Sequence, residues 1–102
     1  ETNEDGIVTT EEELEAFFIV KSIIRSVVTS DRITYKDTRS YFGVQIDNNV
    51  RKTVVRFYFN QPKNKRIAII SEDKSERMYK VQTLDEIYNY ADELTEAAKR
   101  YV

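Results

Sequence analysis

The chain has 102 residues, which is the size of a single domain. It contains no Cys and no His, which excludes disulfides, thiolate or imidazole metal sites and His-based acid–base catalysis. The net charge of −2 is unevenly distributed along the chain. Residues 1–15 hold seven acids and no base, and residues 16–82 hold fourteen bases and six acids. Residues 83–102 hold five acids and two bases. A basic middle between acidic ends is typical of a surface that binds polyanions.

The first eight residues are acidic and contain Asn and Gly, so we interpret residues 1–8 as the end of a linker and residues 9–102 as one domain. The chain begins with Glu, which indicates a piece of a longer protein. Thr10-Glu11-Glu12-Glu13 then predicts a capping box at the start of a helix that reaches Val28. Ile19 falls outside the apolar face of this helix, so we expect it to be exposed.

Five strand-like segments follow, and the turns between them are short. They are residues 32–37, 41–47, 51–60, 65–71 and 77–82. Connections of this length favour an antiparallel meander. Thr83-Leu84-Asp85-Glu86 repeats the capping-box pattern and opens a last helix with apolar residues at three-and-four spacing as far as Tyr101. The sequence therefore predicts an α+β two-layer sandwich in which both helices cover one face of the sheet.

Basic residues and two tyrosines of the middle region form the candidate binding surface. They are Lys36, Arg39, Tyr41, Arg51, Lys52, Arg56, Tyr58, Lys63, Lys65 and Arg66. In the predicted meander, Arg56 and Arg66 share the second sheet face with Tyr41 and Tyr58, and the other residues lie at turns and strand ends. Cations would neutralise phosphates while the rings supply contacts to a nucleic acid. The alternative is a solvated sheet face with ordinary cross-strand pairs between Lys or Arg and Asp.

Catalytic groups are not expected in this chain. Four acids, Asp31, Asp37, Asp47 and Asp73, could be compared with the metal ligands of a nuclease, but they fall at strand ends and turns, where Asp is common for backbone reasons. The hydroxyl residues have no His partner that would activate them. We therefore expect no catalytic residue, no metal and no cofactor. The longest apolar stretch, from Ala16 to Ile24, is far shorter than the ~20 residues that cross a bilayer, so we expect no membrane span.

Four segments, residues 9–25, 32–49, 56–60 and 84–94, carry a family resemblance. They resemble the C-terminal region of bacterial and phage proteins described as type I restriction endonuclease-like, related to the restriction subunit, over about residues 8–102. In that family the nuclease-like part lies in the N-terminal region. The resemblance therefore implies a cytoplasmic, DNA-linked protein and carries over no catalytic residue.

Together these observations predict a non-catalytic C-terminal accessory domain of a restriction endonuclease-like protein that binds DNA non-specifically through the basic sheet surface. The alternative is a module for protein–protein interaction or oligomerisation. It would dock on the nuclease part of its own chain, on a partner subunit or on a second copy. Ile19, Tyr90 and Tyr101 would form its exposed apolar contacts.

Overall fold

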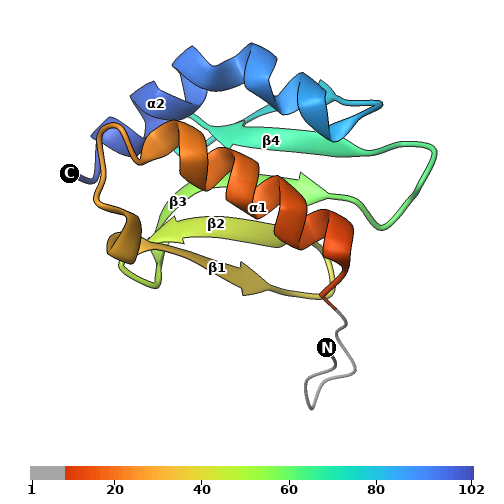
Figure 1. Ribbon diagram of the computed structural model, residues 1–102, viewed down its shortest axis with the longest axis horizontal. Coiled ribbons are helices and arrows are strands. Elements are labelled where there is room, and N and C mark those ends of the chain that lie inside the picture. Colours follow the sequence, from red (N-terminus) through yellow and green to blue (C-terminus); the bar gives the residue numbers. More distant parts are fainter. Residues whose placement is uncertain (1–8) are drawn as a thin grey trace.

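The computed structural model describes residues 9–102 of the chain and confirms the expected α+β architecture. An N-terminal helix, a five-stranded antiparallel sheet and a C-terminal helix follow one another, and both helices lie on the same face of the sheet (Figure 1). The residues that we interpret as the end of a linker, 1–8, lie outside the described part. None of the helices in residues 9–102 combines the length and the hydropathy that crossing a membrane requires.

Helix α1 (Glu11–Ile24) begins at the predicted capping box. The Thr10 hydroxyl accepts a hydrogen bond from the Glu13 N–H at 3.1 Å, and the Glu13 carboxylate accepts one from the Thr10 N–H at 3.0 Å. These two bonds satisfy amides that have no partner within the helix. The helix ends before Val28, although Val28 stays buried and still donates its N–H to the Ile24 carbonyl at 3.0 Å. The apolar pattern therefore continues through a turn after the regular helix has ended.

The sheet is a meander in which each strand pairs with the next along the chain. The strands are β1 (Ile33–Asp37), β2 (Phe42–Ile46), β3 (Asn49–Tyr58), β4 (Arg66–Ile70) and β5 (Glu76–Lys80), in the order β1-β2-β3-β4-β5. A short 3-10 turn, η1 (Ser30–Arg32), leads into β1. In the register, Phe42 faces Phe57, which in turn faces Ile67. Alternation places these side chains on the face toward the helices, where all three are buried.

The β2–β3 hairpin contains both a tight turn and a bulge. Asp47 and Asn48 have φ values of 58° and 54°, as the two central residues of a type I′ turn require. Ile46 pairs with Asn49, but Gln45 pairs with Thr53, so residues 50–52 project from the ladder as an arc that has no partner on β2. We call residues 50–52 the β3 arc.

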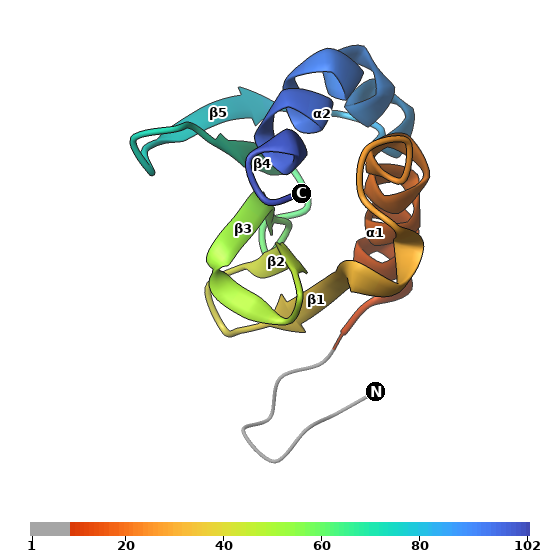
Figure 2. The same cartoon turned by 90° about the vertical axis from the view of Figure 1, so that its left-hand side faces the viewer.

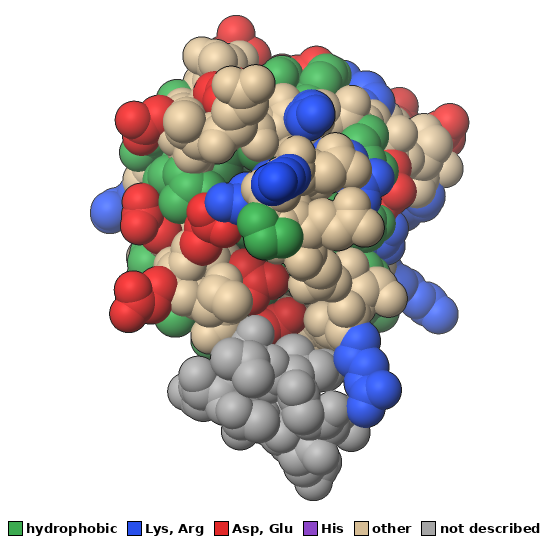
Figure 3. Space-filling model, turned by 90° about the vertical axis from the view of Figure 1, so that its right-hand side faces the viewer, with side chains coloured by type: hydrophobic (Ala, Val, Ile, Leu, Met, Phe, Trp, Pro, Cys, Tyr) green, Lys and Arg blue, Asp and Glu red, His purple; other side chains and the backbone are tan. Residues whose placement is uncertain are grey.

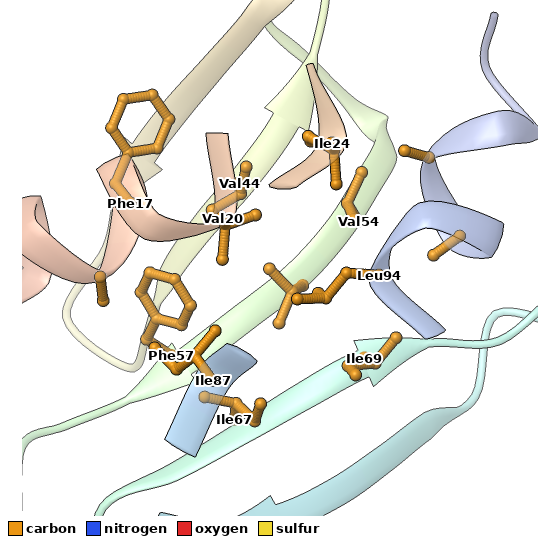
Figure 4. Packing of buried hydrophobic residues seen from close by; sticks show 14 of the residues in the cluster. Phe17, Val20, Ile24, Val44, Val54, Phe57, Ile67, Ile69, Ile87 and Leu94 are labelled. Carbon is orange, nitrogen blue, oxygen red and sulfur yellow. The ribbon is translucent and has the colours of Figure 1, made fainter. Parts of the chain in front are cut away.

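The helical layer closes over the core with a second helical region that differs from the predicted single helix. It begins as the 3-10 helix η2 (Leu84–Tyr90) and continues as α2 (Ala91–Lys99). The Glu86 carboxylate accepts hydrogen bonds from the N–H groups of Gln82 and Thr83, each at 2.8 Å, which fixes the start of η2. In Figure 4 the apolar side chains of the helical elements, for example Leu94, point into the space between the helices and the strands.

Three residues that were expected to be exposed on the helices are packed instead. Ile19, Tyr90 and Tyr101 are partly buried against the core, and the Tyr90 ring stacks on Tyr79 with 4.4 Å between centroids. The prediction of an exposed apolar patch on these residues is therefore wrong. The physical reason is that α1 and α2 lie next to each other on one face of the sheet, so residues at the margin of each apolar stripe find a neighbour. Figure 2 shows the two helices on one side of the sheet, with the β4–β5 hairpin extending away from them.

Candidate nucleic-acid interface

The helices leave the second sheet face open, and strand register determines which side chains share it. Lys36, Gly43, Arg56, Ala68 and Met78 lie in one row across the five strands, because each is the ladder partner of the next. The neighbouring row contains Tyr58, Arg66 and Lys80. Side chains in such rows stand within reach of one another on the same face. We call the surface that these two rows and Tyr41 form the open face.

Arginine and tyrosine alternate in a column along the open face. The Arg56 guanidinium carbon lies 4.8 Å from the centre of the Tyr41 ring, and that of Arg66 lies 5.4 Å from the centre of the Tyr58 ring. The two rings meet edge to face with 6.0 Å between centroids. Cation–π contacts of this kind hold an arginine in place without consuming its hydrogen-bond donors. We call Tyr41, Arg56, Tyr58 and Arg66 the Arg–Tyr column.

Gly43 makes room for the column. A Cβ atom at this position would lie 3.3 Å from Cε1 of Tyr41, which is a tighter contact than side chains normally make. The absence of a side chain therefore lets the Tyr41 ring lie against strand β2, where Arg56 covers it.

Glu76 is the single acidic side chain that the described strands place on the open face. Its Oε2 atom accepts a hydrogen bond from Nη1 of Arg56 at 3.0 Å and another from the Tyr58 hydroxyl. Burial lowers the pKa of Arg56, but the hydrogen bond to Glu76 and the neighbouring charges outweigh burial and raise that pKa. Burial and the same carboxylate raise the pKa of Tyr58, so its phenol stays protonated. Arg56 therefore stays charged and the Tyr58 ring stays neutral at neutral pH.

The guanidinium groups of the column are not fully paired within the described part of the chain. Among the described residues, the buried Nε atoms of Arg56 and Arg66 have no hydrogen-bond partner. Nη1 of Arg66 is 3.6 Å from the thioether sulfur of Met78, which is a weak acceptor. Met78 is 41% exposed, so the surface next to Arg66 is apolar and accessible. Such a surface can contact an anion and an aromatic or sugar group at the same time.

The structure brings together five of the ten residues predicted for the site. They are Lys36, Tyr41, Arg56, Tyr58 and Arg66. Arg39 and Lys63 lie in the β1–β2 and β3–β4 loops at one end of the open face, where the Asn60 side chain donates a hydrogen bond to the Arg39 carbonyl at 2.9 Å. Arg51 lies in the β3 arc at the other end.

Two predicted residues are directed elsewhere by long-range pairing. Lys65 forms an ion pair with Glu12 of α1, so its ammonium group lies toward the helical layer and not on the open face. Lys52 pairs with Asp47 at 3.1 Å beside the β2–β3 turn, where Arg32 also pairs with Asp47 at 2.9 Å. Both ammonium groups are held away from the open face, one beside α1 and the other beside the β2–β3 turn, which removes them from the candidate interface.

Sequence reasoning missed Lys80 on the open face. The register places Lys80 opposite Arg66 and in the row of Tyr58. The signal was present as strand alternation, because Glu76, Met78 and Lys80 have the same parity on the last strand. The parity shows that these residues share a face, but it takes the pairing with β4 to show that the face is the open one.

Charge separates between the two layers of the molecule. Residues 29–82, which form the sheet and its turns, carry twelve Lys and Arg against six Asp and Glu, and residues 83–102 carry five acids against two bases. In Figure 3 the helical layer lies on the left, where acidic side chains are frequent, and most of the basic side chains lie toward the centre and right. The sheet side is therefore the more attractive side for a polyanion.

Two concave areas adjoin the column, one at each end. Ser40, Tyr58, Asn60, Gln61 and Arg66 line a hollow of about 150 Å³ beside the β3–β4 loop. A larger pocket of about 400 Å³ lies at the other end, between the β3 arc and the β4–β5 turn. Because column residues line both hollows, the open face forms a continuous track along β3.

The four acids that could be compared with nuclease ligands lie in separate structural settings. Asp37 accepts a hydrogen bond from the Thr9 hydroxyl at 2.7 Å, Asp47 pairs with Arg32 and Lys52, and Asp73 accepts from the Ser75 N–H at 3.1 Å. Within residues 9–102, no group of three or more acidic side chains is placed to hold a metal ion. The structure accounts for Asp37 by its hydrogen bond and for Asp47 by its ion pairs, while Asp31 lies in η1 and Asp73 in the β4–β5 turn.

Comparison of the chain with protein-family models, with curated proteins and with solved structures returns no match. The geometry of the open face is therefore the main indication of what the chain binds.

Proposed function

We propose that the open face binds nucleic acid non-specifically, and that the chain is a non-catalytic, cytoplasmic DNA-binding accessory domain of a restriction endonuclease-like protein. The Arg–Tyr column carries this proposal, because cations held in cation–π contacts alternate with rings on a face that has one described carboxylate. The resemblance supports DNA as the nucleic acid, since the related proteins act in a DNA-linked context.

The cations have different roles in this proposal. Lys36 and Lys80 lie at the two edges of the sheet, on β1 and β5, and Arg66 lies between them on β4. These three attract phosphates from several directions, while Arg56 is oriented by Tyr41 and Glu76. Contacts to phosphates position a nucleic acid without reading its sequence, and this is the basis for non-specific binding.

Salt-dependent binding of the 102-residue chain to a fluorescent DNA duplex tests the proposal. If about six phosphates are contacted, the affinity falls by ~10³ between 50 and 200 mM salt, because bound counterions are released. Arg66→Gln and Lys80→Gln each weaken binding and reduce the slope of log affinity against log salt by about 1. Matched substitutions on the helical layer, Arg25→Gln and Lys99→Gln, leave both quantities unchanged. A flat salt response, or equal effects of all four substitutions, would exclude the proposed interface.

Self-association is a second candidate function, favoured by a different surface. Phe18 and Tyr35 are 59% and 42% exposed and line a groove of about 490 Å³ between α1 and β1. β1 is an edge strand, so a second copy could pair with its free side. Light scattering of the chain and of a Phe18→Ser variant tests this candidate. A wild-type dimer that becomes monomeric in the variant supports it, and a wild-type monomer at high concentration excludes it.

A further inference from the structure

The larger of the two hollows combines an apolar floor with cationic walls. The buried residues Thr53 and Ile70 provide the floor, and Arg51, Arg56 and Lys74 surround it, in a pocket of about 400 Å³ that Val50 also lines. We call it the arc pocket. Its volume is within the range of small-ligand sites, ~300–1,000 Å³. Val50 is 57% exposed, which leaves an aliphatic surface at the mouth of the pocket.

Backbone geometry fixes the walls of the arc pocket. Lys74 has a φ of 72°, a left-handed conformation that non-glycine residues rarely adopt, within the β4–β5 turn. Its ammonium group donates hydrogen bonds to the Arg51 carbonyl at 2.9 Å and to the Tyr101 hydroxyl at 2.8 Å, and it lies 5.0 Å from the centre of the Tyr101 ring. The β4–β5 turn and the β3 arc are therefore connected across the pocket by one lysine.

The arc pocket continues the open face, because Arg56 belongs to both. Arg56 stacks on Tyr41 in the column and also lines the pocket. A nucleic-acid strand that follows the column along β3 therefore reaches the mouth of the arc pocket. This continuity connects the pocket with the function proposed above, on which the present inference rests.

We propose that the arc pocket receives an unpaired nucleobase, so that the preferred ligand is single-stranded DNA. A bare phosphate would be held by the cations alone and would gain nothing from the exposed Val50 side chain. A wholly apolar ligand would make no use of the positive charges of Arg51 and Lys74. An unstacked base with its attached phosphates matches both the apolar and the cationic part of the pocket lining. The base covers apolar surface while the phosphate faces the cations. A base inside a duplex is paired and stacked and cannot enter.

Three probes of equal length separate the contribution of the base from that of the phosphates. They are a thymidine single strand, a strand of abasic residues and a DNA duplex, each titrated at the same salt concentration with the 102-residue chain. We expect the thymidine strand to bind roughly fivefold more tightly than the abasic strand, because the base covers part of the aliphatic surface of Val50 and Ile70. Val50→Gln removes this preference and leaves the affinities for the abasic strand and the duplex unchanged. The control Phe18→Gln, an exposed apolar residue outside the open face, preserves the preference.

The outcomes distinguish the pocket from the interface as a whole. If the thymidine and abasic strands bind equally and with the same salt dependence, the base pocket is wrong while the binding of phosphates by the open face stands. If Val50→Gln weakens binding to all three probes by the same factor, Val50 does not contact a base and the inference is overturned. If none of the three probes binds, both the pocket and the proposed function are wrong.

Discussion

Arg56 on β3 reaches across β4 to form an ion pair with Glu76 on β5, with 3.0 Å between Nη1 and Oε2. The strand between them presents Ala68 at that position, and its small side chain leaves room for the guanidinium to pass. Arg56 is thus held from two sides, by Glu76 and by the Tyr41 ring. Because the pair is partly exposed, we expect it to affect ligand binding and not to stabilise the fold.

Replacing this carboxylate is expected to strengthen the binding of DNA. Glu76→Gln keeps an oxygen that can accept from Arg56 but removes one negative charge from the open face. The affinity for a duplex should rise by about fivefold, or about 1 kcal/mol, the size of one charge–charge interaction near a solvated surface. Titrations at fixed salt measure the effect. Glu15→Gln, which makes the same change on the exposed side of α1, is the control, and equal affinities in the two variants would contradict the role of the open face.

A side chain at Gly43 should displace the Tyr41 ring. Gly43→Ala brings a Cβ atom to 3.3 Å from Tyr41, and Gly43→Val adds two methyl groups in the same crowded space. We expect the valine variant to be destabilised by ~1–3 kcal/mol, the usual cost of overpacking, and the alanine variant by less. Urea unfolding measures the stability, and the NMR shifts of the Tyr41 ring report its position. Unchanged shifts in the valine variant would show that the ring does not depend on Gly43.

Truncation of Phe57 should damage the core far more than truncation of an exposed aromatic residue. The Phe57 ring is fully buried and stacks between Phe42 and Phe59, with centroid distances of 5.6 and 5.2 Å. Phe57→Ala is expected to cost ~3–5 kcal/mol of unfolding free energy. Phe18→Ala, on the exposed side of α1, should stay within ~0.5 kcal/mol of wild type. Similar losses in both variants would mean that the groove beside Phe18 contributes to the core.

The stability of the chain should depend on Asp47 in the acid range. Hydrogen bonds from Arg32 and Lys52 hold the pKa of Asp47 well below its ordinary value of 3.8. A carboxyl group whose pKa is lower in the folded state than in the unfolded state stabilises the protein at pH values above the unfolded-state pKa. This contribution is lost as the pH falls below 3.8 toward the folded-state pKa. Asp47→Asn keeps a residue that tolerates the φ of 58° but loses the charge.

Thermal unfolding of wild type and Asp47→Asn from pH 7 to pH 2 measures this contribution. The variant is expected to be less stable than wild type at pH 7. The difference in stability should shrink as the pH falls below 3.8. A difference that remains constant over this range would show that the effect of Asp47 comes from the turn conformation and not from its ionised form.

Local sequence signals were sufficient for much of the fold. The capping box at Thr10 was predicted from residues three positions apart, and it is present. The Asp47-Asn48 turn is equally local, because both residue types tolerate the left-handed backbone that the turn requires. Phe42, Val44 and Ile46 alternate with Gly43 and Gln45 in the sequence, and all three belong to the core under the helices, because a strand has a period of two residues.

Other features depend on contacts that no local pattern contains. Lys65 pairs with Glu12, which is 53 positions away, and this pairing removes Lys65 from the open face. The β3 arc interrupts the regular pairing of β2 with β3, and its amino-acid composition does not predict this interruption. Lys80 joined the interface because of the register between β4 and β5. The candidate site was therefore predictable as a sheet face with two arginines and two tyrosines, but not in its full membership.

The β3 arc also bears on how this scaffold tolerates sequence change. Because Asn49 is already paired with Ile46 on one side and Thr53 with Gln45 on the other, the three positions between them contribute no rung to the ladder. Lengthening or recomposing this stretch would leave the strand pairing and the buried phenylalanines where they are. Variants of the domain could thus differ in ligand preference while the sheet and the core stay the same.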